Sequence, residues 1–206
     1  MEPLSVARVA LPLVLIVFAG VLIVWPVVRL RRQTGIWAVT LHRETVPGNR
    51  FMGLVLLSIA AGLGVLVTRF ALDGPLAVGV WAAPRGVTLG GLWLCAAAVV
   101  LIAVAQRQMG ESFRIGIDDA KTALVSRGLF RWVRNPIYTG MLALFLGVML
   151  VIPCATSVLL GAGAAAAIAI HTRLEERNLR ALHGDAYRAY AKGVGRFVPG
   201  IGRLRM

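Results

Sequence analysis

Residues 138–170 read YTGMLALFLGVMLVIPCATSVLLGAGAAAAIAI, a 33-residue run without a charged side chain. A bilayer core of about 30 Å is crossed by about 20 helical residues, so this run is too long for one straight helix. Pro153 lies near its middle, where a residue without a backbone N–H most easily interrupts a helix. We therefore predict a hairpin of two rather short membrane helices that turns at residues 152–155.

Three more apolar runs precede the hairpin, at residues 4–30, 51–72 and 87–105, and each is long enough to cross a bilayer. The first run contains Pro12 and Pro26, which membrane helices tolerate when neighbouring helices satisfy the freed carbonyls. The run is longer than the apolar stretch of a cleaved signal peptide and is followed by Arg31–Arg32, so we expect it to stay as a helix. The predicted fold is an all-α polytopic membrane protein with about five transmembrane helices.

The charge distribution supports a membrane protein. Charged residues make up 15% of the chain, below the roughly 25% of soluble domains, and the net charge is +13. A basic chain can indicate nucleic-acid binding, but nineteen of the 22 Lys and Arg fall in residues 29–50, 107–134 and 173–205, between the apolar runs. This pattern follows the positive-inside rule. We expect a plasma or inner membrane protein with these segments cytoplasmic, the N-terminus outside and no nucleic-acid partner.

The organisation predicted from these runs is a single membrane domain over residues 1–206. Residues 1–105 supply three N-terminal transmembrane helices, and residues 106–206 form a functional half that contains the hairpin 138–171. After the hairpin, the spacing of apolar residues predicts an amphipathic helix that leaves the membrane on the cytoplasmic side, with a turn at residues 183–185.

Small residues also carry predictions. Cys95 and Cys154 lie in apolar surroundings without metal-ligand spacing, so we expect small core residues and no metal site. The run Gly161–Ala167 has only glycine and alanine, which lets another helix pack closely in a membrane.

Polar side chains gather at both ends of the hairpin. A helix out and a helix back return the chain to the side it left, so Tyr138 and Glu175 are expected to be neighbours. An acid at this depth costs several kcal/mol without a partner and therefore suggests a functional site. The alternative is that Glu175 and Glu176 are interfacial acids paired to nearby arginines, and the residues alone leave both interpretations open. Those arginines are Arg173, Arg177 and Arg180.

The start of the hairpin has the pattern of a helix N-terminus, with Asn135 as N-cap and Pro136 at the first helical position. Amide donors that remain free at such an end suit an anionic group. Plain capping beside basic interfacial anchors is the alternative.

Several motifs in the last 100 residues occur in a fixed order. They are VSRGLF at 125–130, RNPIYTG at 134–140, the pair Glu175–Glu176, and GDAYRAY at 184–190 with RFVP at 196–199. Together they resemble the isoprenylcysteine carboxyl methyltransferase and phospholipid methyltransferase superfamily, whose members are integral membrane enzymes that use S-adenosylmethionine. The sequence lacks the glycine-rich fingerprint by which soluble Rossmann domains bind nucleotide-like cofactors, which agrees with this resemblance.

The resemblance implies a cofactor pocket between the last two membrane helices and the cytoplasmic segments beside them. Asn135 stands where many relatives have histidine, so a proton-accepting role there loses support. The residues implied to border the cofactor are Leu124, Val125 and Phe130, and those implied to hold its polar groups are Asn135, Pro136, Ile137, Tyr138, Glu175 and Glu176.

The same resemblance implies methyl transfer by direct displacement, which needs no metal. Arg134, His171 or Arg173 would orient an anionic acceptor, or His171 would take a proton from an amine or thiol. The acceptor is lipid-like or small, and the sequence does not set the oligomeric state. Glu175→Gln is expected to remove cofactor binding, whereas Glu176 should point elsewhere and tolerate glutamine better.

Two alternatives remain at this point. One is an NADPH-dependent enzyme like the membrane sterol reductases, which generally have more membrane helices than the five expected here. The other is a non-catalytic membrane protein that retains the pocket as a sensor or assembly factor.

Overall fold

The computed structural model describes residues 3–35, 47–110 and 124–204. The predicted cytoplasmic residues Arg43, Arg114 and Lys121 lie outside these ranges. The elements are α1 (Pro3–Ala19), the π-helix η1 (Gly20–Val24), α2 (Trp25–Thr34), α3 (Pro47–Asp73), the 3-10 turn η2 (Leu76–Val78), α4 (Arg85–Met109), the 3-10 turn η4 (Gly128–Arg131), α5 (Pro136–Val151) and α6 (Ala155–Gly193).

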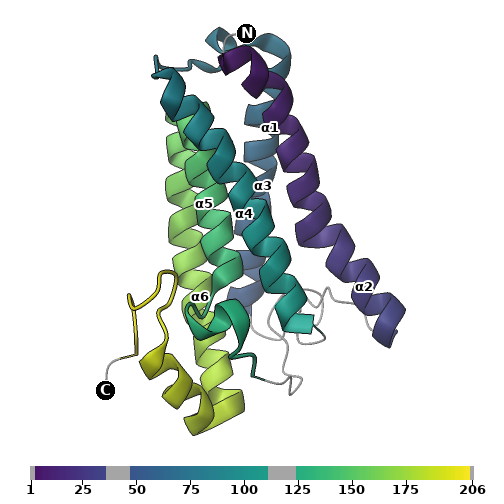
Figure 1. Ribbon diagram of the computed structural model, residues 1–206, viewed down its shortest axis with the longest axis vertical. Helices are drawn as coiled ribbons and strands as arrows, with labels where there is room; N and C mark the ends of the chain where they lie inside the picture. The colour runs from purple at the N-terminus through teal and green to yellow at the C-terminus, as the bar shows by residue number, and fades with distance from the viewer. Residues whose placement is uncertain (1–2, 36–46, 111–123, 205–206) are drawn as a thin grey trace.

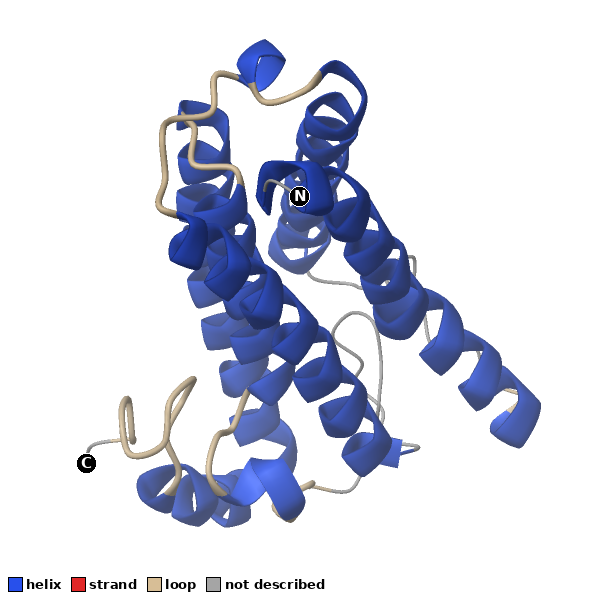
Figure 2. Ribbon diagram, turned by 45° about the horizontal axis from the view of Figure 1, so that its top comes forward, coloured by secondary structure: helices blue, strands red, loops and turns tan. Residues whose placement is uncertain are grey.

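The helices form one elongated bundle, with the two chain ends at opposite ends of the molecule (Figure 1). Helix α4 packs along α5, α3 packs along α6, and α1 contacts both α3 and α4. All the regular elements in the described ranges are helical (Figure 2). The predicted all-α class is therefore confirmed.

Four helical stretches are long and apolar enough to span a membrane. They are Leu4–Arg29, Phe51–Asp73, Arg85–Met109 and Ala155–Gly193, with Pro136–Val151 as a shorter apolar helix. The shorter helix, α5, has 16 residues, a rise of about 24 Å. Four to five spans result, in agreement with the sequence.

The hairpin turn lies where Pro153 predicted it, between the end of α5 and the start of α6. Cys154 is the N-cap of α6 and forms a capping box with Ser157. The Pro153 carbonyl accepts a hydrogen bond from Trp81 N at 2.7 Å, which joins the turn to the α3–α4 loop. The prediction of two short arms is wrong for the second arm, because α6 continues for 39 residues.

Within α6, Gly184 has φ 54° and ψ −126°, a backbone conformation that strongly favours glycine. The amphipathic helix predicted from Leu174 onward is the continuation of α6, and it bends at the predicted turn so that its last part is set at an angle to the membrane part (Figure 1). Tyr187 and Ala191 after the bend are buried, so this part of the helix packs against the protein.

Glycines allow the closest helix contacts in the bundle. The predicted small-residue run packs as expected, since a Cβ on Gly161 would lie 2.5 Å from Met149 Sδ of α5. A second seam, between α4 and α5, was not predicted: a Cβ on Gly147 would lie 2.5 Å from Cys95 Sγ and 2.8 Å from the Gly91 carbonyl. Both cysteines are buried core residues, as predicted.

The π-helix η1 marks the effect of Pro26 on the first span. In a regular helix the N–H of residue 26 would bond to the carbonyl of Leu22, but proline has no N–H. Here the Leu22 carbonyl accepts a hydrogen bond from Gln106 Nε2 of α4 at 3.2 Å. Gln106 is 2% exposed, so a buried side chain of a neighbouring helix replaces the missing donor.

Replacing Gln106 with leucine should lower the free energy of unfolding by about 0.5–1.5 kcal/mol, the usual net value of one hydrogen bond. Unfolding by SDS in mixed micelles, followed by circular dichroism, measures the change. Pro26→Ala restores a backbone donor, so the same substitution should cost less in that background. Equal costs in both backgrounds would show that the Gln106 bond does not compensate for the proline.

Candidate functional site

The segment before the hairpin is fixed to two helices. Leu129 N donates to Gln108 Oε1 of α4 at 2.7 Å, and the adjacent Gly128 has a φ of 63°. Phe130 is buried, and its carbonyl accepts a hydrogen bond of 2.6 Å from the Tyr190 hydroxyl, which lies beyond the bend of α6. Turn η4 is thereby held between the end of α4 and the end of α6.

The hairpin brings Tyr138 and Glu175 together, as predicted. The Tyr138 hydroxyl donates to Glu175 Oε2 at 2.9 Å. The ring of His171 lies edge-on to Tyr138, with 5.8 Å between centroids and an interplanar angle of 81°. His171 and Glu175 are four residues apart and therefore share one face of α6. This cluster of Tyr138, His171 and Glu175 is the candidate site.

The cluster lies at the end of the membrane-spanning part of the hairpin. Glu175 is 20 residues beyond the start of α6, a rise of about 30 Å, which equals the thickness of a hydrocarbon core. Tyr138 is in the first turn of α5. Both helices thus present their polar groups at the same membrane interface.

The charge of Glu175 is not balanced by the residues that the structure describes. Tyr138 is the hydrogen-bond partner found for its carboxylate, and among the described residues no cationic side chain forms an ion pair with it. A partly buried carboxylate in apolar surroundings is costly without a cation. Glu175 is therefore suited to a positively charged ligand.

Glu176 has the opposite environment. Its side chain is 3% exposed, and its carboxylate forms ion pairs with Arg134 Nη2 at 3.0 Å and Arg196 Nη2 at 2.8 Å. We call these three residues the buried clamp. Glu176 is thus engaged by protein cations, and its cofactor contact and its tolerance of glutamine, both expected from the sequence, are not supported by this environment.

The contacts of Arg134 give it a structural role. Its five N–H donors are all engaged: two bond to Glu176, and three bond to main-chain carbonyls near the end of the chain. Those carbonyls belong to Ala191, Val194 and Gly202. No donor remains to orient an acceptor, so these contacts do not support the catalytic role expected of Arg134 from the sequence.

Asn135 and Pro136 occupy the N-cap and first helical positions of α5, as the sequence predicts. The Asn135 side chain, however, does not cap the helix. Its amide donates to Glu176 Oε1 at 3.3 Å and to the Arg196 carbonyl at 3.2 Å. The Asn135 side chain therefore supports the buried clamp instead of capping α5.

Of the other predicted site residues, one faces away from the cluster and four are buried or partly buried. Arg173 is exposed and lies about 160° around α6 from His171 and Glu175, so it faces away from the cluster. Pro136 is buried and Ile137 is partly buried beside Tyr138 in the chain. Leu124 and Val125 are partly buried in the segment that leads into η4.

The role of the C-terminal loop, residues 194–204, was not predicted. The Gly195 carbonyl accepts a hydrogen bond from Arg134 N at 2.8 Å, and the Phe197 carbonyl accepts one from Thr139 Oγ1 at 2.8 Å. Arg196 supplies the second cation of the clamp. The available signal was the acidic pair at 175–176, since two adjacent acids beside a membrane require cations from elsewhere in the chain.

Two comparisons place this geometry among known proteins. Residues 86–186, which include the whole hairpin and the acidic pair, match the family model described as phospholipid methyltransferase. The fold is similar to the solved structure of the eukaryotic intramembrane Ras methyltransferase ICMT (isoprenylcysteine carboxyl methyltransferase), with a TM-score of 0.52 and 19% identity. Both comparisons support the resemblance to the membrane methyltransferase superfamily.

The similarity to ICMT covers 78% of this chain and 56% of the ICMT chain, so the chain spans just over half the length of that structure. At this identity the likeness concerns the fold. No curated protein sequence matches the chain.

Proposed function

We propose that this protein is a membrane methyltransferase that transfers a methyl group from S-adenosylmethionine to a lipid-like or small acceptor at the membrane interface. The observation that carries the proposal is the carboxylate of Glu175. It lies at the interface end of the hairpin, is fixed by Tyr138, and has no cationic partner among the described residues. The family match over residues 86–186 supports the same reaction class.

The residues present fit this cofactor by charge. S-adenosylmethionine supplies a methyl group on a positively charged sulfur and also carries an ammonium group. Glu175 would accept a charge-assisted hydrogen bond from the ammonium or from the ribose. Tyr138 would hold the carboxylate in place through its 2.9 Å hydrogen bond. Glu176 is not available for this task because the clamp cations engage it.

The neighbouring side chains would complete the pocket. His171 lies against the Tyr138 ring and would take, at an imidazole nitrogen, the proton that an amine or thiol acceptor loses. We propose that apolar residues near the start of the hairpin border the cofactor and exclude water, which strengthens electrostatic contacts inside. These are Leu124, Val125, Phe130 and Ile137.

The acceptor class follows from the position of the site. A cluster at the edge of the hydrocarbon core is reached sideways from the bilayer by lipid-like molecules and from the aqueous side by the cofactor. A prenylcysteine-like carboxylate, a phospholipid amine and a thiol all fit this geometry. The fold shared with ICMT, whose description names a Ras methyltransferase, favours a lipid-modified acceptor.

The proposal is tested with the purified protein in lipid nanodiscs. Incubation with S-adenosylmethionine radiolabelled in the methyl group and a total membrane extract should place label in one lipid or lipidated product, identified by chromatography. Titration calorimetry should detect binding of S-adenosylmethionine and none of NADPH. Binding of NADPH alone would favour a reductase, and cofactor binding with no labelled product would favour a non-catalytic pocket.

We also propose that the site faces the cytoplasm and the hairpin turn faces outside, because the basic segments lie at the site end. Ala155 is exposed at the turn, whereas Cys95 and Cys154 are buried, so Ala155→Cys introduces a selectively accessible thiol. A membrane-impermeant maleimide should label it in intact cells. Arg203→Cys, exposed in the C-terminal loop, should react only after permeabilisation, and the reverse labelling pattern would invert the topology.

A further inference from the structure

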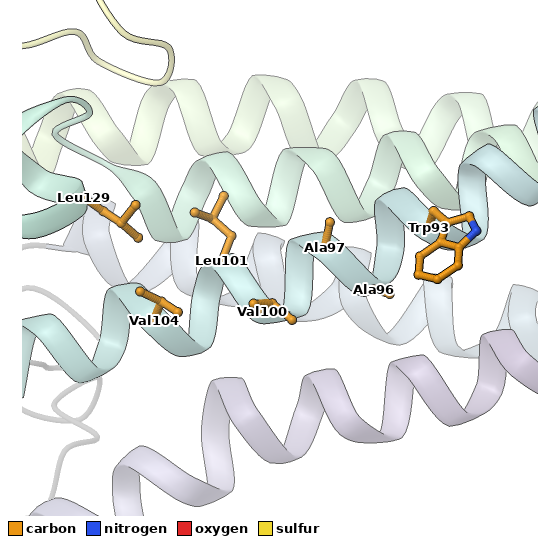
Figure 3. A pocket seen from close by; sticks show the side chains of 7 residues that line it. All are labelled: Trp93, Ala96, Ala97, Val100, Leu101, Val104 and Leu129. Atoms are coloured by element: carbon orange, nitrogen blue, oxygen red, sulfur yellow. The ribbon is translucent and has the colours of Figure 1, made fainter.

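An apolar groove runs along α4 and is separate from the residues of the candidate site. It has a volume of about 490 Å³, and Figure 3 shows six of its lining side chains along α4 and the seventh, Leu129, on the neighbouring segment. Trp93 is 77% exposed and Val100 is 62% exposed, so the groove opens to the outside of the bundle. The lining residues are Trp93, Ala96, Ala97, Val100, Leu101, Val104 and Leu129.

The length and position of the groove match one leaflet of a bilayer. From Trp93 to Val104 the helix rises about 16 Å, roughly half of a hydrocarbon core of about 30 Å. Most of the groove lies in the half of α4 that ends at Met109. Since α4 is long and apolar enough to span the membrane, the groove faces lipid and is as long as one half of the hydrocarbon core.

The end of the groove is basic. Arg107 continues the row of Val100 and Val104 at helical spacing, and it is exposed beside the Trp25 ring. Turn η4 supplies Leu129 to the same end, where Arg127 and Arg131 are exposed on either side of it. The three arginines form no salt bridge with a described residue.

The described residues at this end of the groove carry positive charge and no negative charge. Leu129 N is bonded to Gln108 Oε1, which holds η4 against the end of α4 where Arg107 lies. Neither α4 nor residues 124–137 contain an acidic residue, whereas the segment 111–123 between them, outside the described ranges, contains Glu111, Asp118 and Asp119. The exposed ring of Trp132 has its centroid 4.8 Å from Arg131 Cζ. Tryptophan is amphipathic and is enriched at the headgroup level of membranes. An apolar groove that ends in guanidinium groups without an ion-pair partner among the described residues suits an amphipathic, anionic occupant.

We propose that the groove binds one hydrocarbon chain of an anionic phospholipid, whose phosphate is held by Arg107, Arg127 and Arg131. Guanidinium groups form charge-assisted, often bidentate hydrogen bonds with phosphate, and the apolar row provides contact along the chain. This lipid would remain bound to the protein in the groove between α4 and η4, next to the candidate site. The proposal does not depend on the methyl-transfer reaction.

The test uses native mass spectrometry of the whole protein, released from micelles that contain phosphatidylglycerol or phosphatidylcholine with identical chains. The wild type should retain phosphatidylglycerol in preference. Arg107→Gln with Arg131→Gln should weaken its retention by about tenfold or more, from the usual contribution of each basic residue. Arg85→Gln, at the opposite end of α4, is the control and should change little.

A second pair of variants tests the groove itself. Ala97→Trp fills the groove at an exposed position and should remove bound phosphatidylglycerol. Ala166→Trp makes the same change on an exposed face of α6 and should leave retention unchanged. Circular dichroism spectra identical to the wild type establish that each variant is folded. Equal retention of the two lipids by the wild type, or unchanged phosphatidylglycerol retention in Ala97→Trp, would overturn the proposal.

Discussion

Replacing Glu176 with glutamine should lower the free energy of unfolding by about 3–5 kcal/mol, the usual cost of removing one partner from a buried ion pair. Glutamine keeps the shape of the side chain but leaves the Arg134 guanidinium, 1% exposed, without its counter-charge. Arg196 loses its anion as well. The C-terminal loop should then detach from the start of α5.

SDS-induced unfolding in mixed micelles, followed by circular dichroism, measures the stability change, and limited proteolysis reports on the loop. Residues 194–204 should become sensitive to protease in Glu176→Gln. The matched control is Glu175→Gln, the same chemical change one residue earlier, where no described cation is lost. Equal stability losses at the two positions would show that the clamp has no special role.

Replacing Glu175 with glutamine should weaken S-adenosylmethionine binding by about 1.5–3 kcal/mol, the value of a hydrogen bond to a charged group. This corresponds to about a 10- to 100-fold higher dissociation constant. The Tyr138 hydroxyl can still donate to the amide oxygen of glutamine, so the local geometry is kept. Fold stability should change little, because the carboxylate has no buried cation among the described residues.

Calorimetric titration of the purified variant with S-adenosylmethionine decides this prediction. Tyr138→Phe removes the hydroxyl that fixes Glu175 but keeps the carboxylate, so it should cause a smaller loss of affinity. An unchanged affinity in Glu175→Gln would remove this carboxylate from the cofactor site. The two glutamate variants together separate the functions of adjacent acids: one should lose ligand affinity and the other stability.

The sequence predicted the hairpin because its signal is local. A 33-residue apolar run must fold back within a bilayer, and Pro153 determines where. That topology also brings Tyr138 to the same end of the hairpin as the acidic pair at 175–176. Helix identity and the number of spans were likewise predictable, since hydropathy and length decide them.

The partners of individual polar groups were not predictable, because they depend on contacts between distant segments. Gln106 and Leu22 are 84 residues apart, and nothing in either neighbourhood indicates the hydrogen bond between them. The choice between the two acids likewise depends on where α6 places each side chain. A rotation of about 100° along the helix directs one acid towards Tyr138 and the other towards two arginines.

The connections of Arg134 determine the order in which this protein can mature during synthesis. Arg134 is translated well before Glu176, and Gly202, whose carbonyl it also contacts, emerges from the ribosome later still. Until then the guanidinium must remain at the aqueous interface, so the hairpin can insert but its polar end cannot close. A premature stop codon after residue 193 should therefore yield a chain that enters the membrane normally and is then removed by cellular quality control.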